Sequence, residues 1–326
     1  MILGSLAAAA IAAICITPFI GSVPTPITDV LNGTGEATDI FWRLRVPRVT
    51  LAFLAGAGLG IAGMTFQAMF RNPLATPFTL GVSSGAALGA GIAIRLGWTI
   101  TLLGISPVVI CSFVGALASL LIVYGITLAR RGFSTAIMLL AGVAVSFFFS
   151  SVLLFIQYIS DFSSSFRIVR WLMGGLETVG YDAAWGLAPF VVSGVAIVAY
   201  LLRELNLLAI GDDIAVSRGV NTAKAKCMLF IGTTMMVGGV VAFCGPIGFV
   251  GMMAPHICRL LIGSEHRYLM PATLLFGGTF LILCDLLART LIAPAEIPVG
   301  VITALLGGPF FVWLLLRRTS TRHIMQ

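Results

Sequence analysis

Long uncharged stretches separated by short polar segments dominate the chain. Ten of these stretches have about the length that a helix needs to cross ~30 Å of hydrocarbon. They lie near residues 2–20, 49–70, 79–96, 105–128, 134–157, 184–202, 227–243, 248–263, 269–288 and 297–316. Their apolar positions run on without alternation, which favours helices over barrel strands. The eighth stretch is short, and the segment Gly245-Pro246-Ile247-Gly248 before it predicts an interrupted helix.

Composition supports the same interpretation. Of the 326 residues, 59% are hydrophobic and only 10% are charged, which is too few charges to cover a surface that faces water. In lipid, the backbone must satisfy its own hydrogen bonds. We therefore predict an all-α polytopic membrane protein of about ten transmembrane helices, forming one domain over residues 1–326. Residues 1–28 carry no charged side chain, so a first transmembrane helix is favoured over a cleaved signal peptide.

The distribution of basic residues predicts the orientation. With the C-terminus in the cytoplasm, twelve of the nineteen basic residues lie on the cytoplasmic side, as the positive-inside rule requires. The net charge of +7 then reflects orientation, and we predict no nucleic-acid partner. Arg43, Arg45 and Arg48 cluster on the opposite side. Since orientation does not explain this cluster, it indicates another function.

The sequence supports neither a cofactor-binding motif nor a catalytic one. Gly58 to Gly63 match a dinucleotide-binding fingerprint but lie inside an apolar stretch, where glycines at this spacing pack helices together. No phosphate-binding P-loop sequence is present, so energy from ATP has to come from a separate subunit. The six cysteines are scattered singly and the three histidines are far apart, which favours neither a disulfide framework nor a metal site. We therefore predict no enzyme activity, no cofactor and no metal.

The longest cytoplasmic loop, residues 203–226, mixes apolar and charged residues around Gly211 and Gly219. This pattern predicts two short helices with a glycine between them. Such a helix pair outside the membrane is typical of a protein-docking element, and a loop folded onto its own bundle is the alternative.

Several motifs in order resemble the FecCD-type permease family, the membrane subunits of ABC importers for iron-siderophores, haem and cobalamin. They are Arg45-Val46-Pro47-Arg48, Gln67-Ala68-Met69-Phe70-Arg71-Asn72-Pro73-Leu74-Ala75, Leu80-Gly81-Val82-Ser83-Ser84-Gly85, Leu140-Ala141-Gly142-Val143-Ala144, Trp171-Leu172-Met173-Gly174-Gly175, Gly245-Pro246-Ile247-Gly248-Phe249-Val250-Gly251, Pro255-His256-Ile257-Cys258-Arg259 and Ala295-Glu296-Ile297-Pro298-Val299-Gly300. The resemblance covers nearly the whole chain but does not specify the cargo.

The resemblance implies a complex. Two permease subunits, either two copies of this chain or one with a homologue, would line one pathway in the membrane lipid, and two ATPase subunits would dock in the cytoplasm. A periplasmic or lipid-anchored binding protein would dock outside on Arg45 and Arg289, with Arg48 contributing. Coupling to the ATPase would involve Leu208, Gly211, Asp212, Asp213, Ala215, Arg218 and Gly219.

The family's cytoplasmic gate corresponds by resemblance to Asn72, Leu74, Ser134, Thr135 and Ala136. Ala136 is smaller and less polar than the residue that some relatives have there. The implied mechanism is alternating access powered by the separate ATPase, in the plasma membrane of a prokaryote (the inner membrane in a Gram-negative cell).

The leading interpretation is an importer permease for an iron chelate, either a ferric siderophore or haem. Cobalamin is the alternative within the family, and oxyanion uptake is more distant. An ion-coupled carrier is an alternative of another class, although no pair of carboxylates lies deep in a predicted span. A membrane-embedded enzyme is disfavoured because no cluster of nucleophiles or metal ligands is evident.

Overall fold

A computed structural model describes the chain except for residues 22, 24, 34, 102–103, 130–134 and 323–326. In this described part, ten helices coincide with the ten predicted stretches. They are α1 (Ile2–Ile16), α4 (Val46–Met69), α5 (Val82–Arg95), α6 (Pro107–Ala129), α7 (Thr135–Tyr158), α9 (Asp182–Tyr200), α12 (Thr222–Cys244), α13 (Val250–Ile262), α14 (His266–Thr290) and α15 (Val299–Arg322). Among the residues described, seven helical segments are long and apolar enough to cross a membrane, and α5, α13 and Val299–Leu314 of α15 are shorter apolar helices.

Shorter helices connect or cap these long ones. They are η1 (Thr17–Phe19), α2 (Ile27–Asn32), α3 (Glu36–Asp39), η2 (Ile40–Arg45), η3 (Pro77–Leu80), α8 (Phe162–Leu172), α10 (Leu202–Ile210) and α11 (Asp212–Ser217). The helix predicted from residue 49 in fact continues outward through η2 and α3 to Glu36. Charged residues end the apolar stretch but not the helix, because backbone hydrogen bonding does not depend on the side chains being apolar. Arg43, Arg45 and Arg48 therefore lie on ordered helical turns.

Helix α4 is the centre of the larger group of helices and packs against α9, α12, α13 and α14. Glycines make these contacts close. A Cβ atom on Gly63 would lie 1.7 Å from the carbonyl oxygen of Gly251, and one on Gly56 would lie 2.2 Å from that of Gly277. Such small-residue contacts let backbones approach where lipid provides no hydrophobic drive for association.

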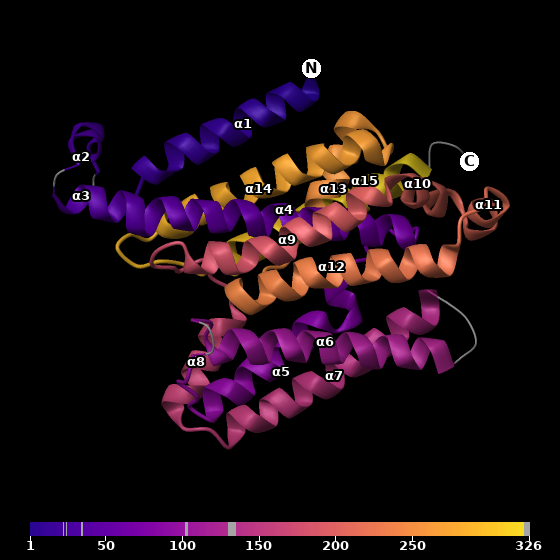
Figure 1. The fold of residues 1–326 in the computed structure, drawn as a ribbon, viewed down its shortest axis with the longest axis horizontal. Helices are drawn as coiled ribbons and strands as arrows, with labels where there is room; N and C mark the ends of the chain where they lie inside the picture. The colour runs from indigo at the N-terminus through magenta and orange to yellow at the C-terminus, as the bar shows by residue number, and fades with distance from the viewer. Residues whose placement is uncertain (22, 24, 34, 102–103, 130–134, 323–326) are drawn as a thin grey trace.

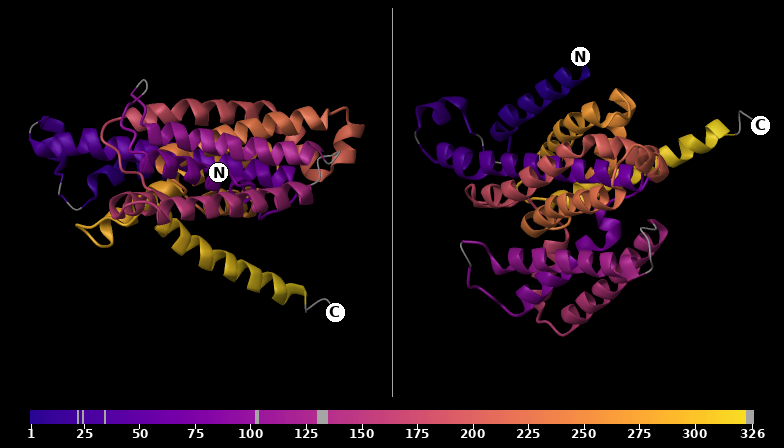
Figure 2. Two further views of the ribbon diagram at one scale, coloured as in Figure 1. Left: turned by 90° about the horizontal axis from the view of Figure 1, so that it is seen from below. Right: turned by 45° about the vertical axis from the view of Figure 1, so that its right-hand side comes forward.

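A second group contains α5, α6, α7 and α8, drawn below the first in Figure 1. Here Gly85 packs against the backbone of Gly115, and Gly89 packs against that of Cys111. Helix α12 joins the two groups through its contacts with α5 and α6. Figure 2 shows α15 leaving the bundle at an angle towards its C-terminus.

The predicted interruption between residues 245 and 248 is confirmed. Helix α12 ends at Cys244, and Gly245 adopts a left-handed φ of 67° in which a Cβ atom would lie 2.6 Å from the Trp171 carbonyl oxygen. The nearby Gly175 N–H donates to the Cys244 carbonyl at 2.8 Å. These contacts tie the segment after α8 to the break between α12 and α13.

The bundle has two ends, at the left and the right of Figure 1. We call the first the arginine end, formed by residues 39–48, 161–179 and 285–298. The other is the α10–α11 end, where α9 and α10 finish and where α12 and α14 begin. Both candidate partner sites predicted from the sequence, the arginine cluster and the helical loop, lie at these two ends.

Candidate functional site

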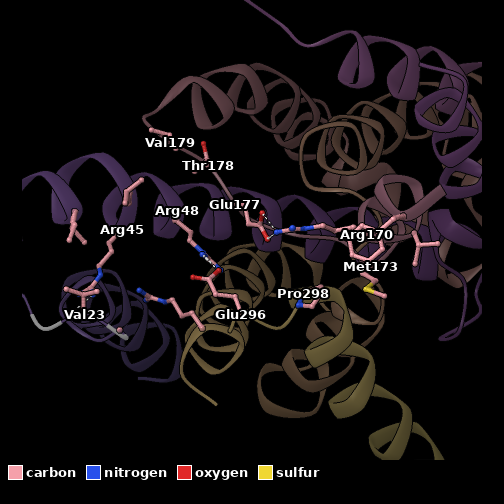
Figure 3. Close-up of a pocket in the computed structure, with 16 residues that line it drawn as sticks. Val23, Arg45, Arg48, Arg170, Met173, Glu177, Thr178, Val179, Glu296 and Pro298 are labelled. Atoms are coloured by element: carbon pink, nitrogen blue, oxygen red, sulfur yellow. Dashed lines mark hydrogen bonds and ion pairs between the residues drawn. The ribbon is translucent and has the colours of Figure 1, made fainter. Parts of the chain in front are cut away.

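A cavity of about 930 Å³ opens at the arginine end (Figure 3). Its walls come from η2, the start of α4, α8, the segment that follows α8, the end of α14 and the loop before α15. Apolar side chains make up much of the lining, namely Val23, Ile40, Leu44, Phe166, Val169, Met173, Val179 and Pro298. The charged lining residues are Arg45, Arg48, Arg170, Glu177, Arg289 and Glu296. The cavity is thus an apolar chamber with four arginines and two carboxylates.

Helix α8 is held in place by its first residues. The Asp161 carboxylate caps the helix by accepting from the Ser164 N–H at 3.0 Å, and hydrogen bonding from Ser164 lowers the pKa of Asp161. Near its other end, Arg170 forms an exposed ion pair with Glu177 at 2.7 Å. The capped helix therefore presents Arg170 and Met173 to the cavity.

Arg45 is buried, with 7% of its surface exposed. Its guanidinium donates to the Pro18 carbonyl at 3.0 Å, to the Thr25 hydroxyl at 2.7 Å and to the Val23 carbonyl. These partners belong to the connector that follows α1, residues 17–25. Among the described residues, no carboxylate forms an ion pair with Arg45. Its positive charge is therefore stabilised by carbonyl and hydroxyl dipoles alone.

Arg48 and Arg289 share the buried carboxylate of Asp285, which is 1% exposed. Arg48 Nε lies 2.8 Å from Asp285 Oδ1, and Arg289 Nε lies 3.5 Å from Asp285 Oδ2. Arg48 also pairs with Glu296 at 2.7 Å, and Arg289 donates to the Thr17 carbonyl at 2.8 Å. This ionic cluster joins α4, α14, the connector and the loop before α15. Asp285 and Arg289 can pair because they lie four residues apart, on one face of α14.

The structure brings the three predicted docking arginines to one cavity, but it does not expose them equally to a partner. Arg45 and Arg289 are 7% and 6% exposed, and both bind the connector. Their guanidinium groups face carbonyls and carboxylates of this same chain, and a role in docking stays a prediction. Arg43 lies apart from the cavity lining and forms an exposed pair with Asp39 at 3.1 Å.

Sequence reasoning assigned no role to Glu177 or Arg170, and it did not foresee that Arg48 pairs with Asp285 and Glu296. The available signal for the Arg48 pairs was weak. Asp285 and Glu296 are carboxylates at the arginine end of a chain that has only twelve acidic residues. A partner for Arg48 could have been sought among them, but no local spacing connects residues that lie 237 positions apart.

At the α10–α11 end, the loop 203–226 contains the two short helices predicted for it, with Gly211 between them. Leu208 and Ala215 are fully buried and pack into the bundle, whereas Ile210, Ile214 and Val216 are exposed. Asp212 pairs with Lys226 of α12 at 2.7 Å. The remaining predicted coupling residues, Asp213, Arg218 and Gly219, lie along α11 and the turn after it, and no partner is present to test their role.

Two hydrogen bonds fasten α10 to the beginning of α14. The Asn206 amide oxygen accepts from the His266 backbone N–H at 3.1 Å and lies 2.6 Å from His266 Nδ1. His266 is buried. The helix pair is therefore folded onto its own bundle and also exposes an apolar edge, while docking of a protein partner on that edge stays a prediction.

The predicted gate is described only in part. Asn72 and Leu74 lie in the turn between α4 and η3, where the Asn72 side chain accepts from the Leu74 N–H at 2.9 Å. Ser134 lies outside the described residues, and Thr135 and Ala136 are the first residues of α7. Whether these five residues form one gate stays a prediction.

No three His, Cys, Asp or Glu side chains come together as a metal site within the described part of the chain. The six cysteines are free thiols. The lining of the arginine end offers recognition by charge and by apolar contact.

Comparison with known proteins shows what this bundle belongs to. The model of the FecCD transport family matches residues 9–317. The chain belongs to the FecCD transport family. Its permeases are transport proteins, and the chain is accordingly an ABC importer permease, a multi-pass protein of the plasma membrane.

Similar proteins support the assignment. The hemin transport system permease protein HmuU of Yersinia pestis is 39% identical over 294 residues, covering 89% of this chain and 87% of HmuU. The vitamin B12 import system permease protein BtuC of Salmonella arizonae is 37% identical over 295 residues, covering 89% of this chain and 86% of BtuC. A solved structure of a metal-chelate type ABC transporter in an inward-facing conformation matches with a TM-score of 0.85 at 32% identity, covering 97% of this chain and 98% of that one.

We predict that Asp285→Asn strongly destabilises the folded protein, because it leaves Arg289 buried without an ionic partner. Removing one member of a buried pair costs about 3–5 kcal/mol. Glu296→Gln is the matched control, because Glu296 is 41% exposed and its pair with Arg48 contributes less than about 1 kcal/mol. Thermal unfolding in detergent measures both variants, and equal losses in the two would contradict the central role of Asp285.

Proposed function

We propose that this permease carries an iron chelate, a ferric siderophore or haem, into the cell, with the ATPase activity located in a separate subunit. The observation that carries the proposal is the cavity at the arginine end. Its volume of about 930 Å³ lies near the top of the range for small-molecule sites, about 300–1,000 Å³. Apolar walls with four arginines in the lining suit a bulky chelate with an apolar body and anionic groups.

Cobalamin is the alternative cargo. The similarity of the chain to a hemin permease at 39% identity and to a vitamin B12 permease at 37% supports both cargoes about equally. The chemistry of the cavity favours the anionic chelate, because four of its six charged residues are arginines. An anionic cargo such as haem, with its carboxylates, gains more from these four lining arginines than a corrinoid does.

A second permease subunit, in the simplest case another copy of this chain, completes the pathway. Helices α7 and α15 expose large apolar side chains, with Phe147 72%, Phe155 62% and Leu316 69% exposed. Figure 2 shows α15 reaching away from the bundle. An apolar surface of this kind suits a partner subunit and lipid, and two copies would place two cavities beside one pathway.

ATP-driven movement enters at the α10–α11 end. The ATPase, in two copies, docks on the exposed apolar edge of α10 and α11, and the Asn206–His266 and Asp212–Lys226 contacts pass its movement to α14 and α12. These two helices cross the bundle, and α14 ends at the ionic cluster of Asp285 and Arg289. ATP binding thus opens or closes the pathway by alternating access without any chemistry in the permease.

Uptake into proteoliposomes tests both the transporter class, an ATP-driven importer, and the cargo. The permease with its ATPase and binding protein is expected to take up radiolabelled haem or ferric siderophore only when ATP is inside, and excess cobalamin is expected not to compete. Competition by cobalamin assigns the alternative cargo. Uptake that persists without the ATPase or without ATP would contradict the importer mechanism and favour an ion-coupled carrier.

Docking of the binding protein depends on the positive charge of the arginine end. We predict that Arg45→Gln and Arg289→Gln each slow its association several-fold at low salt, and that the difference shrinks at high salt as the charges are screened. Neutral substitutions avoid placing a carboxylate in a buried site. Arg267→Gln, exposed at the α10–α11 end, is the matched control. Association rates and salt slopes equal to wild type in both variants would refute the docking role.

Coupling has its own test on the exposed edge of α11. We predict that Ile214→Asp and Val216→Asp abolish copurification of the ATPase, because a charge replaces an apolar contact, while the permease still elutes as a folded protein. Ile214 and Val216 are 43% and 58% exposed. The control is Ile27→Asp on α2 at the arginine side, where the isoleucine is 59% exposed. Wild-type ATP-driven uptake by the α11 variants would count against coupling through this edge.

A further inference from the structure

A second cavity of about 390 Å³ lies at the α10–α11 end, separate from the one described above. It is enclosed by the last residue of α9, by α10, by the link from α11 to α12 and by the first turns of α12. Its lining includes Tyr200, Arg203, Glu204, Arg218 and Lys224. Two of its lining residues, Arg218 and Gly219, are also predicted coupling residues, whereas Tyr200, Arg203, Glu204 and Lys224 have no role in the proposed transport.

Three cations gather around this small space. Arg203, Arg218 and Lys224 are all exposed and come from α10, the link after α11 and α12 respectively. In the part of the chain that the structure describes, none of the three forms an ion pair. By contrast, Lys226, two residues on, is buried and paired with Asp212. The pocket therefore offers a concentrated positive charge to an anion from outside the chain.

One carboxylate, that of Glu204, lines the pocket together with the three cations. Its Oε2 atom is buried with no hydrogen-bond partner among the described residues. A buried acceptor without a donor is costly, so this oxygen favours a ligand that brings a hydroxyl or N–H group. The pocket thus combines phosphate-binding cations with one acceptor for a donor on the same ligand.

The pocket lies where a membrane-spanning helix meets the headgroup layer. Tyr200 ends α9 and is 79% exposed, as is typical of the aromatic residues at a membrane interface. Along the same helix, Trp185 and Val192 are 73% and 62% exposed, which gives α9 an apolar outer face that lipid chains can cover. Leu201, Leu207, Val220 and Met228 line the cavity beside the charged groups.

We propose that this pocket binds the headgroup of an anionic phospholipid with a hydroxyl donor, phosphatidylglycerol, in the leaflet at the α10–α11 end. Arg203, Arg218 and Lys224 hold the phosphate, and Glu204 accepts from a glycerol hydroxyl. Basic pockets between helices at the cytoplasmic side are typical of anionic-lipid sites. In the orientation that the basic residues predict, this leaflet is the cytoplasmic one. A lipid there would brace α9 and α10 against the start of α12.

The experiment measures lipid binding to the purified permease–ATPase complex in detergent by native mass spectrometry. The probes are phosphatidylglycerol, phosphatidylmethanol, phosphatidylcholine and inorganic phosphate. We expect Arg203→Gln and Lys224→Gln each to weaken phosphatidylglycerol binding about fivefold and to leave phosphatidylcholine binding unchanged. Both side chains are exposed and unpaired, so their loss leaves folding intact. Arg267→Gln, an exposed arginine at the same end outside the pocket, is the matched control and keeps wild-type affinity.

The hydroxyl contact has a separate readout. Phosphatidylmethanol carries the same charge as phosphatidylglycerol without the hydroxyl donor, so the wild type is expected to bind it about tenfold more weakly. Glu204→Leu removes the acceptor and is expected to abolish that preference. Wild-type binding of phosphatidylglycerol by the Arg203 and Lys224 variants would overturn the proposal. Displacement by an equal concentration of inorganic phosphate would also overturn it, since the site would then bind free phosphate. Loss of the lipid only when the ATPase is present would assign the cations to the ATPase interface instead.

Discussion

A single buried carboxylate holds the arginine end of this permease together. Asp285 lies between Arg48 of α4 and Arg289 of its own helix, and only 1% of its surface is exposed. Taking three charges out of water is costly, and their mutual attraction repays that cost only when the geometry is maintained. Arg48 then reaches Glu296 and Arg289 reaches Thr17, so the positions of the connector and of the loop before α15 both depend on the same carboxylate.

Helix α14 links that cluster to the opposite end. It has 25 residues, which corresponds to about 37 Å at 1.5 Å per residue. It begins at His266, held by Asn206 of α10, and Gly277 near its middle lies against Gly56 of α4. Helix α14 therefore runs from the Asn206 contact to the ionic cluster as one helix. In the coupling proposed above, a displacement of α10 would reach Asp285 and Arg289 along this helix.

Much of the architecture could be predicted because lipid imposes a simple rule on sequence. Uncharged stretches of spanning length correspond to helices, and the break at Gly245 follows from backbone chemistry that is local. The limits of α4 could not be predicted, because charged residues end an apolar stretch but not a helix. The sequence also could not show which residues far apart in the chain lie close together in the fold. Arg48 and Asp285 are 237 residues apart, and only packing of α4 against α14 brings them into contact.

For the candidate sites, the sequence predicted which residues gather but not whether their side chains are buried or exposed. Of the unexplained arginines, Arg45 and Arg48 line one cavity whereas Arg43 does not, and the loop 203–226 did form two helices. The sequence pattern could not reveal that Arg45 and Arg289 are buried, because a guanidinium in an apolar bundle is satisfied by carbonyls that carry no sequence signature. Similarly, Leu208 and Ala215 face the core whereas Ile214 faces outward, and the loop is too short for periodicity to distinguish these faces.

The hydrogen bonds from Arg45 to the connector limit which amino-acid substitutions this segment can accept. Two of its three partners there are main-chain carbonyls, those of Pro18 and Val23, and every amino acid supplies such a group. Residues 17–25 can therefore exchange most side chains and still be recognised. Thr25 and Gly21 are the exceptions, since the Thr25 hydroxyl is the third partner and a Cβ atom on Gly21 would lie 2.6 Å from an Arg45 guanidinium nitrogen. Arg45 thus recognises this segment mainly through its backbone, and position 21 requires the smallest residue.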